Sequence, residues 1–355
     1  MASFFKGKRG SAVLGVDIGT SAVKTVQLKH SGKRVELVHL GVAPLPPEAI
    51  VDGAIMDGGA VIAALQQIFD EHKIGVKDVA VGVSGNSVII KPIKMPLMKP
   101  QELADSIQWE AEQHIPFAIE DVNLDYEILR SPPGAVEMDV LLVAVKKEVI
   151  SEYLTVASSA GLNVAIVDVD AFAVANAYEA AYEVSPDEVV ALLHVGAAVT
   201  TVSILRGGTL LFTRDSVLGG NRYNESIQKM LGVSYEQAET LKVGGRVEGY
   251  TGADSQPAID LVNAEVAGDV RRSIDFFRSA APSGVIHRML VSGGVARLPR
   301  FIPYLSEALD LPVDLANPLR HVKADPKRFD PEYLDHIAPQ LSVGVGLALR
   351  EVGDK

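Results

Sequence analysis

The residues between positions 17 and 24 offer the first groups that could do chemistry. Asp17, Gly19, Thr20, Ser21 and Lys24 lie between two apolar segments, which predicts the tight turn of a β-hairpin. Such a turn leaves backbone N–H groups that, with the hydroxyls and the Lys24 ammonium, can bind the β- and γ-phosphates of a nucleotide. Asp17 would hold a hydrated Mg²⁺, because phosphates already fill part of its octahedral shell. The alternative is a plain hairpin with Lys24 in water.

A weakened copy of this turn follows about half a chain length later. His194 and Gly196 stand where Asp17 and Gly19 stand in the first copy, again between apolar segments. Two such turns facing each other would hold a polyphosphate from both sides, which predicts a nucleotide site built by internal duplication. Imidazole is a poor ligand for a hard cation, so a protonated His194 would instead touch a phosphate directly.

Two segments downstream could complete a nucleotide site. Gly219, Gly220 and Asn221 follow a predicted strand and precede a helix, and paired glycines at a helix N-terminus suit a phosphate. A tight strand-to-helix turn would explain them as well. Glu239 and Lys242 share one face of the next helix, where both could reach ribose hydroxyls, although a solvated ion pair has the same spacing.

A third glycine pair lies near the end of the second half. Gly293 and Gly294 follow a predicted strand at 289–292, and such glycines would let an adenine lie flat against the backbone. Arg297 would then stack on the face of the adenine. The segment 82–86 contains only a partial nucleophile elbow without a convincing His/Asp partner, so we expect it to be structural.

Composition limits the class of protein. The chain has 355 residues, enough for two domains, and is 48% hydrophobic but only 6% aromatic, which is typical of α/β proteins with buried sheets. Its net charge of −12 argues against a nucleic-acid or anionic-lipid footprint. It has no cysteine, no P-loop motif and no histidine pair with zinc-ligand spacing. Residues 1–10 lack the apolar core of a signal peptide.

Hydrophobic periodicity predicts the elements that position these residues. Helical stripes are expected at 61–72, 103–115 and 262–277, and a closing helix with close-packing glycines at 338–349. The nearly uncharged run 189–205 is short for a membrane span and rich in β-branched residues, so it is predicted to form two buried strands. Residues 84–160 have a strand–helix pattern of their own with frequent prolines, which indicates an inserted subdomain.

The order of the motifs resembles the actin/Hsp70/hexokinase superfamily of nucleotide-binding proteins. The Asp-x-Gly turn, its copy and the glycine pair are followed by Ala-Glu-x-x-Lys at 238–242 and Ser-Gly-Gly-x-x-x-Leu-Pro at 292–299. The insertion after strand 79–83 resembles the 1C (SHS2) subdomain of the FtsA division proteins. The runs 18–24, 167–178 and 272–277 are similar to those of the PilM family of type IV pilus assembly proteins, and the resemblance covers about residues 11–350.

This resemblance implies an α/β fold of the actin-like kind, in which two RNase H-like halves surround a nucleotide cleft and an FtsA-type 1C (SHS2) insertion interrupts the first half. The subdomains it implies are 1A at 11–83, 161–187 and 338–355, 1C at 84–160, 2A at 188–232 and 285–337, and 2B at 233–284.

The resemblance also implies a function. Members of this branch are ATP-binding cytoplasmic scaffolds of the pilus inner-membrane platform, needed for twitching motility and recruited to the cytoplasmic face of the membrane. Their partner is the N-terminal cytoplasmic tail of PilN, which docks between subdomains 1A and 1C, beside other inner-membrane and motor components. ATP or ADP with Mg²⁺ is the implied cofactor, without nucleic acid or a transmembrane segment. Self-association is left open.

Position 194 departs from the superfamily pattern, in which an aspartate at the second turn helps to hold Mg²⁺ and the attacking water. Asp168 or Asp170, at the end of the strand 164–169, remains to position a water, although a helix N-cap would also explain Asp170. We therefore expect nucleotide binding with slow hydrolysis at most.

Two other classes stay open. A sugar or carboxylate kinase of the same superfamily would need an aspartate base and a substrate pocket in the cleft. An FtsA-like division protein would need a linker and an amphipathic helix after the fold, and the sequence ends at 350–355 without one, as it ends without the transmembrane helix of type II secretion relatives.

Overall fold

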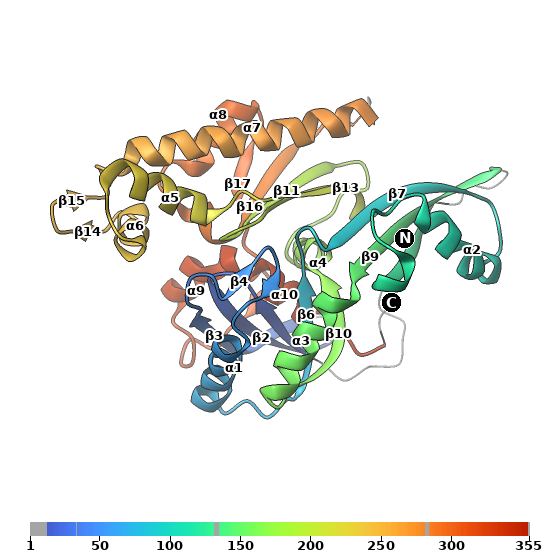
Figure 1. Ribbon diagram of the computed structural model, residues 1–355, viewed down its shortest axis with the longest axis horizontal. Coiled ribbons are helices and arrows are strands. Elements are labelled where there is room, and N and C mark those ends of the chain that lie inside the picture. The colour runs from blue at the N-terminus through green and yellow to red at the C-terminus, as the bar shows by residue number, and fades with distance from the viewer. Residues whose placement is uncertain (1–12, 33, 131–134, 281–283, 354–355) are drawn as a thin grey trace.

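The computed structural model describes residues 13–32, 34–130, 135–280 and 284–353, so the prediction about residues 1–10 lies outside the described part. Its sheets have six, five and three strands, with two further two-stranded ribbons. Figure 1 shows the two large sheets with helices packed against them, and the three-stranded sheet extending to one side. The predicted mixed α/β architecture is confirmed.

The two large sheets repeat one topology. In sheet order, the six strands are β10 (Asn163–Val169), β6 (Asp78–Val83), β1 (Leu14–Ile18), β2 (Ala22–Ser31), β3 (Arg34–Pro44) and β18 (Val322–Lys323). The five are β13 (Thr209–Ser216), β12 (Thr200–Arg206), β11 (Val189–Val195), β16 (Arg288–Ser292) and β17 (Val313–Leu315). β1 pairs antiparallel with β2 and parallel with β6, and β11 does the same with β12 and β16. This repetition is the predicted duplication.

Helices cover both sheets. Those of the first half are α1 (Gly58–His72), α3 (Lys147–Ser159), α4 (Asp170–Ala181), α9 (Pro331–Ile337) and α10 (Ser342–Ala348). Those of the second half are α5 (Gly220–Leu231), α6 (Tyr235–Lys242), α7 (Gln256–Ala280) and α8 (Phe301–Leu309). The stripes predicted at 61–72 and 262–277 lie on α1 and α7 and are buried, except for the exposed His72 at the end of α1. The ribbons are β4 (Ile50–Val51) with β5 (Ala54–Ile55), and β14 (Arg246–Val247) with β15 (Tyr250–Thr251).

The closing helix packs as closely as its glycines allow. It begins as a 3₁₀ turn, η3 (Ala338–Leu341), and continues as α10, where one helix was expected over 338–349. A Cβ on Gly346 would lie 1.8 Å from the carbonyl oxygen of Ala173 in α4, and one on Gly15 of β1 would lie 2.3 Å from that of Gly344. Only glycine permits these approaches, so α10 is fixed between α4 and β1.

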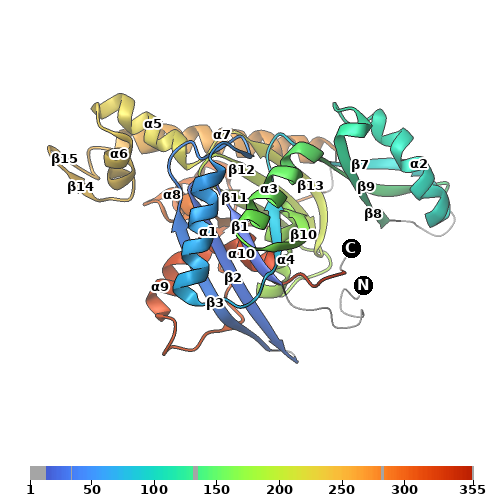
Figure 2. The same ribbon diagram turned by 60° about the horizontal axis from the view of Figure 1, so that its bottom comes forward.

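The insertion has its own sheet and core. Its strands, in sheet order, are β7 (Val88–Pro96), β9 (Glu137–Lys146) and β8 (Val122–Arg130), covered by α2 (Pro100–Glu112) and preceded at β8 by η1 (Ile119–Asp121). The stripe predicted at 103–115 lies on α2 and its following turn and packs into this core. Figure 2 shows the insertion projecting from the side of the molecule. α3, in contrast, buries Tyr153 and Val156 in the core of the first half.

The apolar run 189–205 forms β11, the following turn and most of β12, as predicted. Within the described ranges, no helix is both long and apolar enough to cross a bilayer.

Candidate functional site: a cleft between two matched turns

The two predicted turns have the same backbone geometry. Gly19 donates its N–H to the carbonyl oxygen of Ala22 at 3.1 Å, and Gly196 donates to that of Val199 at 2.9 Å. Each pair encloses two residues, which are Thr20 and Ser21 in the first turn and Ala197 and Ala198 in the second. Within the described part of the chain, the N–H groups of these four residues form no hydrogen bond. They are the donors that an anion would need.

The side chains beside the turns differ between the halves. Asp17 faces Lys24 across β1 and β2, and the Lys24 ammonium lies 3.0 Å from its carboxylate in a largely buried ion pair. His194 and Thr201 occupy the corresponding cross-strand positions of β11 and β12. The first half therefore presents a charged pair where the second presents an imidazole and a hydroxyl.

The electrostatic surroundings of His194 relate the second turn to the first. Burial lowers the pKa of His194 to about 4, and the charges of Asp17 and Lys24 act on it in opposite directions. The Asp17–Lys24 pair of the first turn therefore lies close enough to His194 to act on it electrostatically, and a shared nucleotide cleft between the turns stays a prediction. The Nδ1 atom of His194 lies 2.9 Å from the hydroxyl of Ser292. With its pKa lowered to about 4 the imidazole would be neutral at pH 7, whereas a direct phosphate contact was expected to involve its protonated form.

Asp170 reaches the same cleft. It is the first residue of α4, the N-cap position is Val169, and the alternative of Asp170 as the N-cap therefore does not hold. Burial and the negative charge of Asp17 raise its pKa well above the ordinary aspartate range, while a hydrogen bond from Ser84 opposes this. A Cβ on Gly82 would lie 2.1 Å from its carboxylate oxygen, so only glycine leaves room for Asp170 here.

Asp168 lies elsewhere. Its carboxylate accepts a hydrogen bond from the Arg350 guanidinium at 2.9 Å and one from its neighbour's backbone N–H at 2.8 Å. Asp170, the other aspartate considered for water positioning, has an electrostatic contact to Asp17.

The glycine pair before α5 braces the second turn. The N–H groups of Gly220 and Asn221 donate to the carbonyl oxygens of Gly196 and Ala197 at 2.9 and 2.7 Å. A Cβ on Gly219 would lie 2.7 Å from the latter oxygen, so the glycine allows the close approach. The amides of Gly220 and Asn221 are already paired within the protein, and the role of the segment in holding a phosphate stays a prediction.

The expected ribose residues lie beside this segment. The Lys242 ammonium lies 2.6 Å from the Glu239 carboxylate and 3.5 Å from the carbonyl oxygen of Gly220. The side-chain amide of Asn224 donates to Glu239 at 2.7 Å. Burial lowers the pKa of Lys242, against the pull of Glu239. The spacing alone could not tell this partly buried arrangement from a solvated ion pair.

The third glycine pair divides its roles. A Cβ on Gly293 would lie 2.2 Å from the carbonyl oxygen of Val195, so this glycine packs against the second turn. Gly294, the first residue of η2 (Gly294–Arg297), has open space at the same position, as an adenine would require. The Arg297 guanidinium contacts the carbonyl oxygen and carboxylate of Asp335, which competes with the expected stacking on adenine.

Comparison with known proteins decides the family. A model described as type IV pilus assembly protein PilM matches residues 15–352. The chain belongs to this PilM family. A chain of the PilM–PilN type IV pilus biogenesis complex is 31% identical, with a TM-score of 0.86 over 96% of this chain and 99% of that one.

More distant relatives share the fold. MreB 5 of Spiroplasma citri bound to AMPPNP has a TM-score of 0.53 and 14% identity over 94% of both chains. The cell division protein FtsA of Bacillus subtilis is 23% identical over 379 residues, covering 94% of this chain and 81% of that protein. The predicted actin-like fold of this PilM family member is confirmed.

One carboxylate beside His194 was not expected from the sequence. Asp215 of β13 lies opposite Thr201, which lies opposite His194, so the three share one row and one face of the sheet. Its carboxylate accepts hydrogen bonds from the Thr201 hydroxyl at 2.7 Å and from the Gly85 N–H at 2.9 Å. Ser84 and Gly85, expected to be structural, are thus hydrogen-bonded to Asp170 and Asp215.

Proposed function

We propose that this chain is an actin-like nucleotide-binding scaffold of the type IV pilus inner-membrane platform, which binds the N-terminal cytoplasmic tail of PilN and hydrolyses ATP slowly or not at all. The match to a PilM–PilN complex over nearly the whole of both chains supports the partner. The two matched turns with unpaired amides support the nucleotide. Recruitment to the cytoplasmic face of the inner membrane and contacts with other pilus components follow from the same assignment.

ATP or ADP fits the described residues. The unpaired amides at Thr20, Ser21 and the second turn, together with Lys24, would hold phosphates. Glu239 and Lys242 would reach the ribose, and open space at Gly294 would admit the adenine.

Magnesium would be held through water. Among the described residues there is no group of three acidic, histidine or cysteine side chains arranged to bind a metal ion. Asp17 would therefore contact the ion through its water shell, with the phosphates supplying ligands of their own. Magnesium would supply charge neutralisation between the phosphates and the Asp17 carboxylate.

Slow hydrolysis follows from positions 194 and 170. Neutral His194 offers no carboxylate to a metal-bound water. Asp170 can accept a proton, but repulsion from Asp17 and its burial hold it partly protonated near neutral pH. We assign it as the water-positioning residue of a weak ATPase.

The PilN tail would bind where the first half meets the insertion. Val51, Met56 and Leu154 are exposed apolar side chains of the β4–β5 ribbon and of α3. These elements are joined by a hydrogen bond of 3.1 Å from the N–H of Ile55 to the carboxylate of Glu152. Exposed apolar side chains on neighbouring elements suit the apolar contacts of an extended peptide.

The subdomain division stays a proposal, with one refinement. Because α3 packs into the core of the first half, we propose that the separately packed part of 1C is 88–146 and not the whole of 84–160. The ranges 11–83, 161–187 and 338–355 for 1A, 188–232 for 2A and 233–284 for 2B are kept, whereas the range 285–337 expected for 2A would end before β18 and α9, which pack with the first half.

A pull-down tests the proposal. Purified protein is incubated with an immobilised PilN N-terminal peptide, a scrambled peptide serving as the control, with and without Mg-ATP. Retention by the first peptide alone is expected. A small-molecule kinase would bind neither peptide and would consume ATP in the presence of its sugar.

A further inference from the structure

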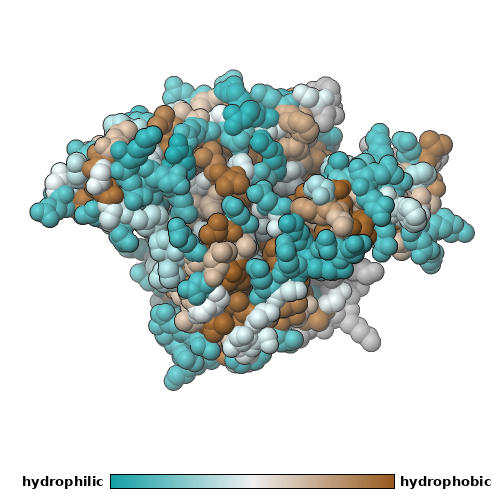
Figure 3. Space-filling model, in the orientation of Figure 1, coloured by the Kyte–Doolittle hydropathy of each residue, from teal (hydrophilic) through white to brown (hydrophobic). Residues whose placement is uncertain are grey.

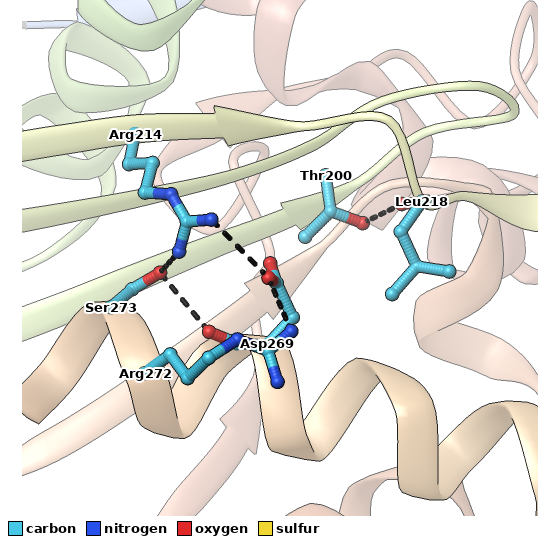
Figure 4. Close-up of polar contacts among 6 residues, drawn as sticks. All are labelled: Thr200, Arg214, Leu218, Asp269, Arg272 and Ser273. Carbon is cyan, nitrogen blue, oxygen red and sulfur yellow. Dashed lines mark hydrogen bonds and ion pairs between the residues drawn. The ribbon is translucent and has the colours of Figure 1, made fainter.

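Strand β13 is held on both faces. On one face, the Arg214 guanidinium donates to the Ser273 hydroxyl of α7 at 3.1 Å and lies 3.5 Å from the Asp269 carboxylate (Figure 4). On the other face, Asp215 contacts Gly85 as described above. β13 is therefore fixed to the long helix of the second half while its next residue reaches the first half.

Gly85 lies where the chain enters the insertion. It follows β6 by two residues and precedes β7, and its φ of +82° is a left-handed conformation that favours glycine. Its neighbour Ser84 bonds to Asp170. The entry of the insertion is thus held between a carboxylate of the second half and the water-positioning residue of the first.

The exit of the insertion is held differently. The chain leaves β9 through α3, where the Tyr153 hydroxyl donates to the carbonyl oxygen of Gly53 at 3.4 Å and Glu152 accepts from Ile55. Both partners belong to the β4–β5 ribbon of the first half. A movement of one half against the other would therefore act on the entry through Asp215, while α3 stays bonded to the first half, and would turn the insertion.

A second contact joins β13 to the insertion. The side chains of β7, β9 and β13 line a small apolar hollow, formed by Ile90, Pro92, Leu141, Leu210, Leu211 and Phe212. Figure 3 shows a hydrophobic patch where β7 and β13 meet in Figure 1. The second half thus touches the insertion along β13 and not only at Gly85.

Asp215 also interacts electrostatically with Asp170. Its negative charge contributes, after burial and Asp17, to the raised pKa of Asp170. Since the interaction is mutual, negative charge placed beside Asp17 and Asp170 acts on Asp215. A nucleotide and its magnesium would change that charge.

We propose that Asp215 is a positioning residue that couples nucleotide binding in the cleft to the orientation of the insertion, through its hydrogen bond to the Gly85 N–H. The inference rests on the proposed function, because it needs a nucleotide in the cleft and a peptide at the insertion. It adds that the two ligands change each other's affinity by this contact.

Peptide affinity measured with and without Mg-AMPPNP tests the coupling. In the unchanged full chain we expect the two affinities for the PilN peptide to differ by about fivefold or more. In Asp215→Ala the ratio should fall below about twofold, with nucleotide affinity kept within a few-fold. Asp260→Ala, which removes an exposed carboxylate of α7, is the control and should keep the full ratio. An unchanged ratio in Asp215→Ala overturns the inference.

Hydrogen exchange gives a test that needs no variant. Mg-AMPPNP should slow exchange of the backbone amides at 84–96, because the Gly85 N–H is bonded directly to Asp215. No change there overturns the inference even if Asp215→Ala does not fold. A protein that binds nucleotide and peptide independently contradicts the coupling alone, whereas one that binds neither contradicts the proposed function as well.

Discussion

At the scale of single residues, position 194 separates the chemistry of the two turns. The backbones match, but the carboxylate of Asp17 corresponds to a buried neutral imidazole in the second half. At these two matched cross-strand positions only the first half supplies charged side chains. Two substitutions test what this asymmetry does.

Restoring a carboxylate should restore metal-dependent hydrolysis. In His194→Asp we expect ATP hydrolysis to rise about tenfold or more and to require Mg²⁺, because a second carboxylate could hold a water of the metal shell. Phosphate release at saturating ATP measures this. His194→Asn has a similar size without the charge and should show no rise; an equal rise in both variants would contradict the metal-based explanation.

The buried charge of Asp170 is expected to lower the stability of the fold. Its raised pKa means that the folded state disfavours the charge, so Asp170→Asn should raise the Tm of the nucleotide-free protein by about 2–4 °C at pH 8, and by less at pH 5. Residual ATP hydrolysis should be lost. Thermal unfolding at both pH values measures the first effect. A lower Tm at pH 8 would show that the carboxylate is stabilised by its neighbours.

At the scale of elements, much could be predicted from hydrophobic spacing and glycine. The stripes of α1 and α7 and both hairpin turns follow from residue types alone. Asp215 could not be found this way, because the pairing of β12 with β13 shifts register between Ile204 and Leu205. Such a shift moves a residue to the other face of a sheet, and only the folded register places Asp215 in the cleft.

The paired glycines at 219–220 show a second limit. Their position before α5 suits a phosphate and a tight turn equally, and the choice depends on which carbonyl groups lie nearby. In the fold, the carbonyl oxygens of Gly196 and Ala197 take those amides. Contacts between segments decide such cases, and a single sequence does not contain them.

The crossing of α10 and α4 offers a test of packing. Gly346→Ala would place its Cβ 1.8 Å from a backbone oxygen, so the helices must separate, and we expect a loss of about 3 kcal/mol in the free energy of unfolding. Gly268→Ala, inside α7, meets only the end of Arg272 at 3.7 Å and should gain about 0.5–1 kcal/mol. Urea denaturation compares them. Equal effects would contradict the role given to this crossing.

At the scale of the whole molecule, buried histidines make the fold sensitive to acid. Burial lowers the pKa of His39 to about 4, with His72 and Arg328 adding to the effect, and His194 behaves alike. The unfolded chain binds protons near pH 6.5, so this stability is present above that pH and is lost as the pH falls towards 4. At pH 5 each of these two histidines should lower the free energy of unfolding by about 2 kcal/mol relative to its value above pH 6.5.

One variant isolates this contribution from the opposite one of Asp170. Urea denaturation gives the free energy of unfolding at pH 7.5 and at pH 5. The decrease between these pH values should be about 2 kcal/mol smaller in His39→Gln than in the unchanged protein. The difference between the two proteins cancels every other titrating group. An identical loss in both would place the acid sensitivity elsewhere.

The insertion projects far enough from the two halves for a rotation at its base to matter at its outer end. It is rooted at two neighbouring points beside the cleft, and α2 lies at its outer end (Figures 1 and 2), so a small rotation at the root becomes a large displacement at the tip. Trp109, the chain's single tryptophan, is 74% exposed on α2. Its intrinsic fluorescence can therefore report binding at that end of the insertion. A partner bound there would be displaced further by a rotation of the insertion than one bound near the cleft.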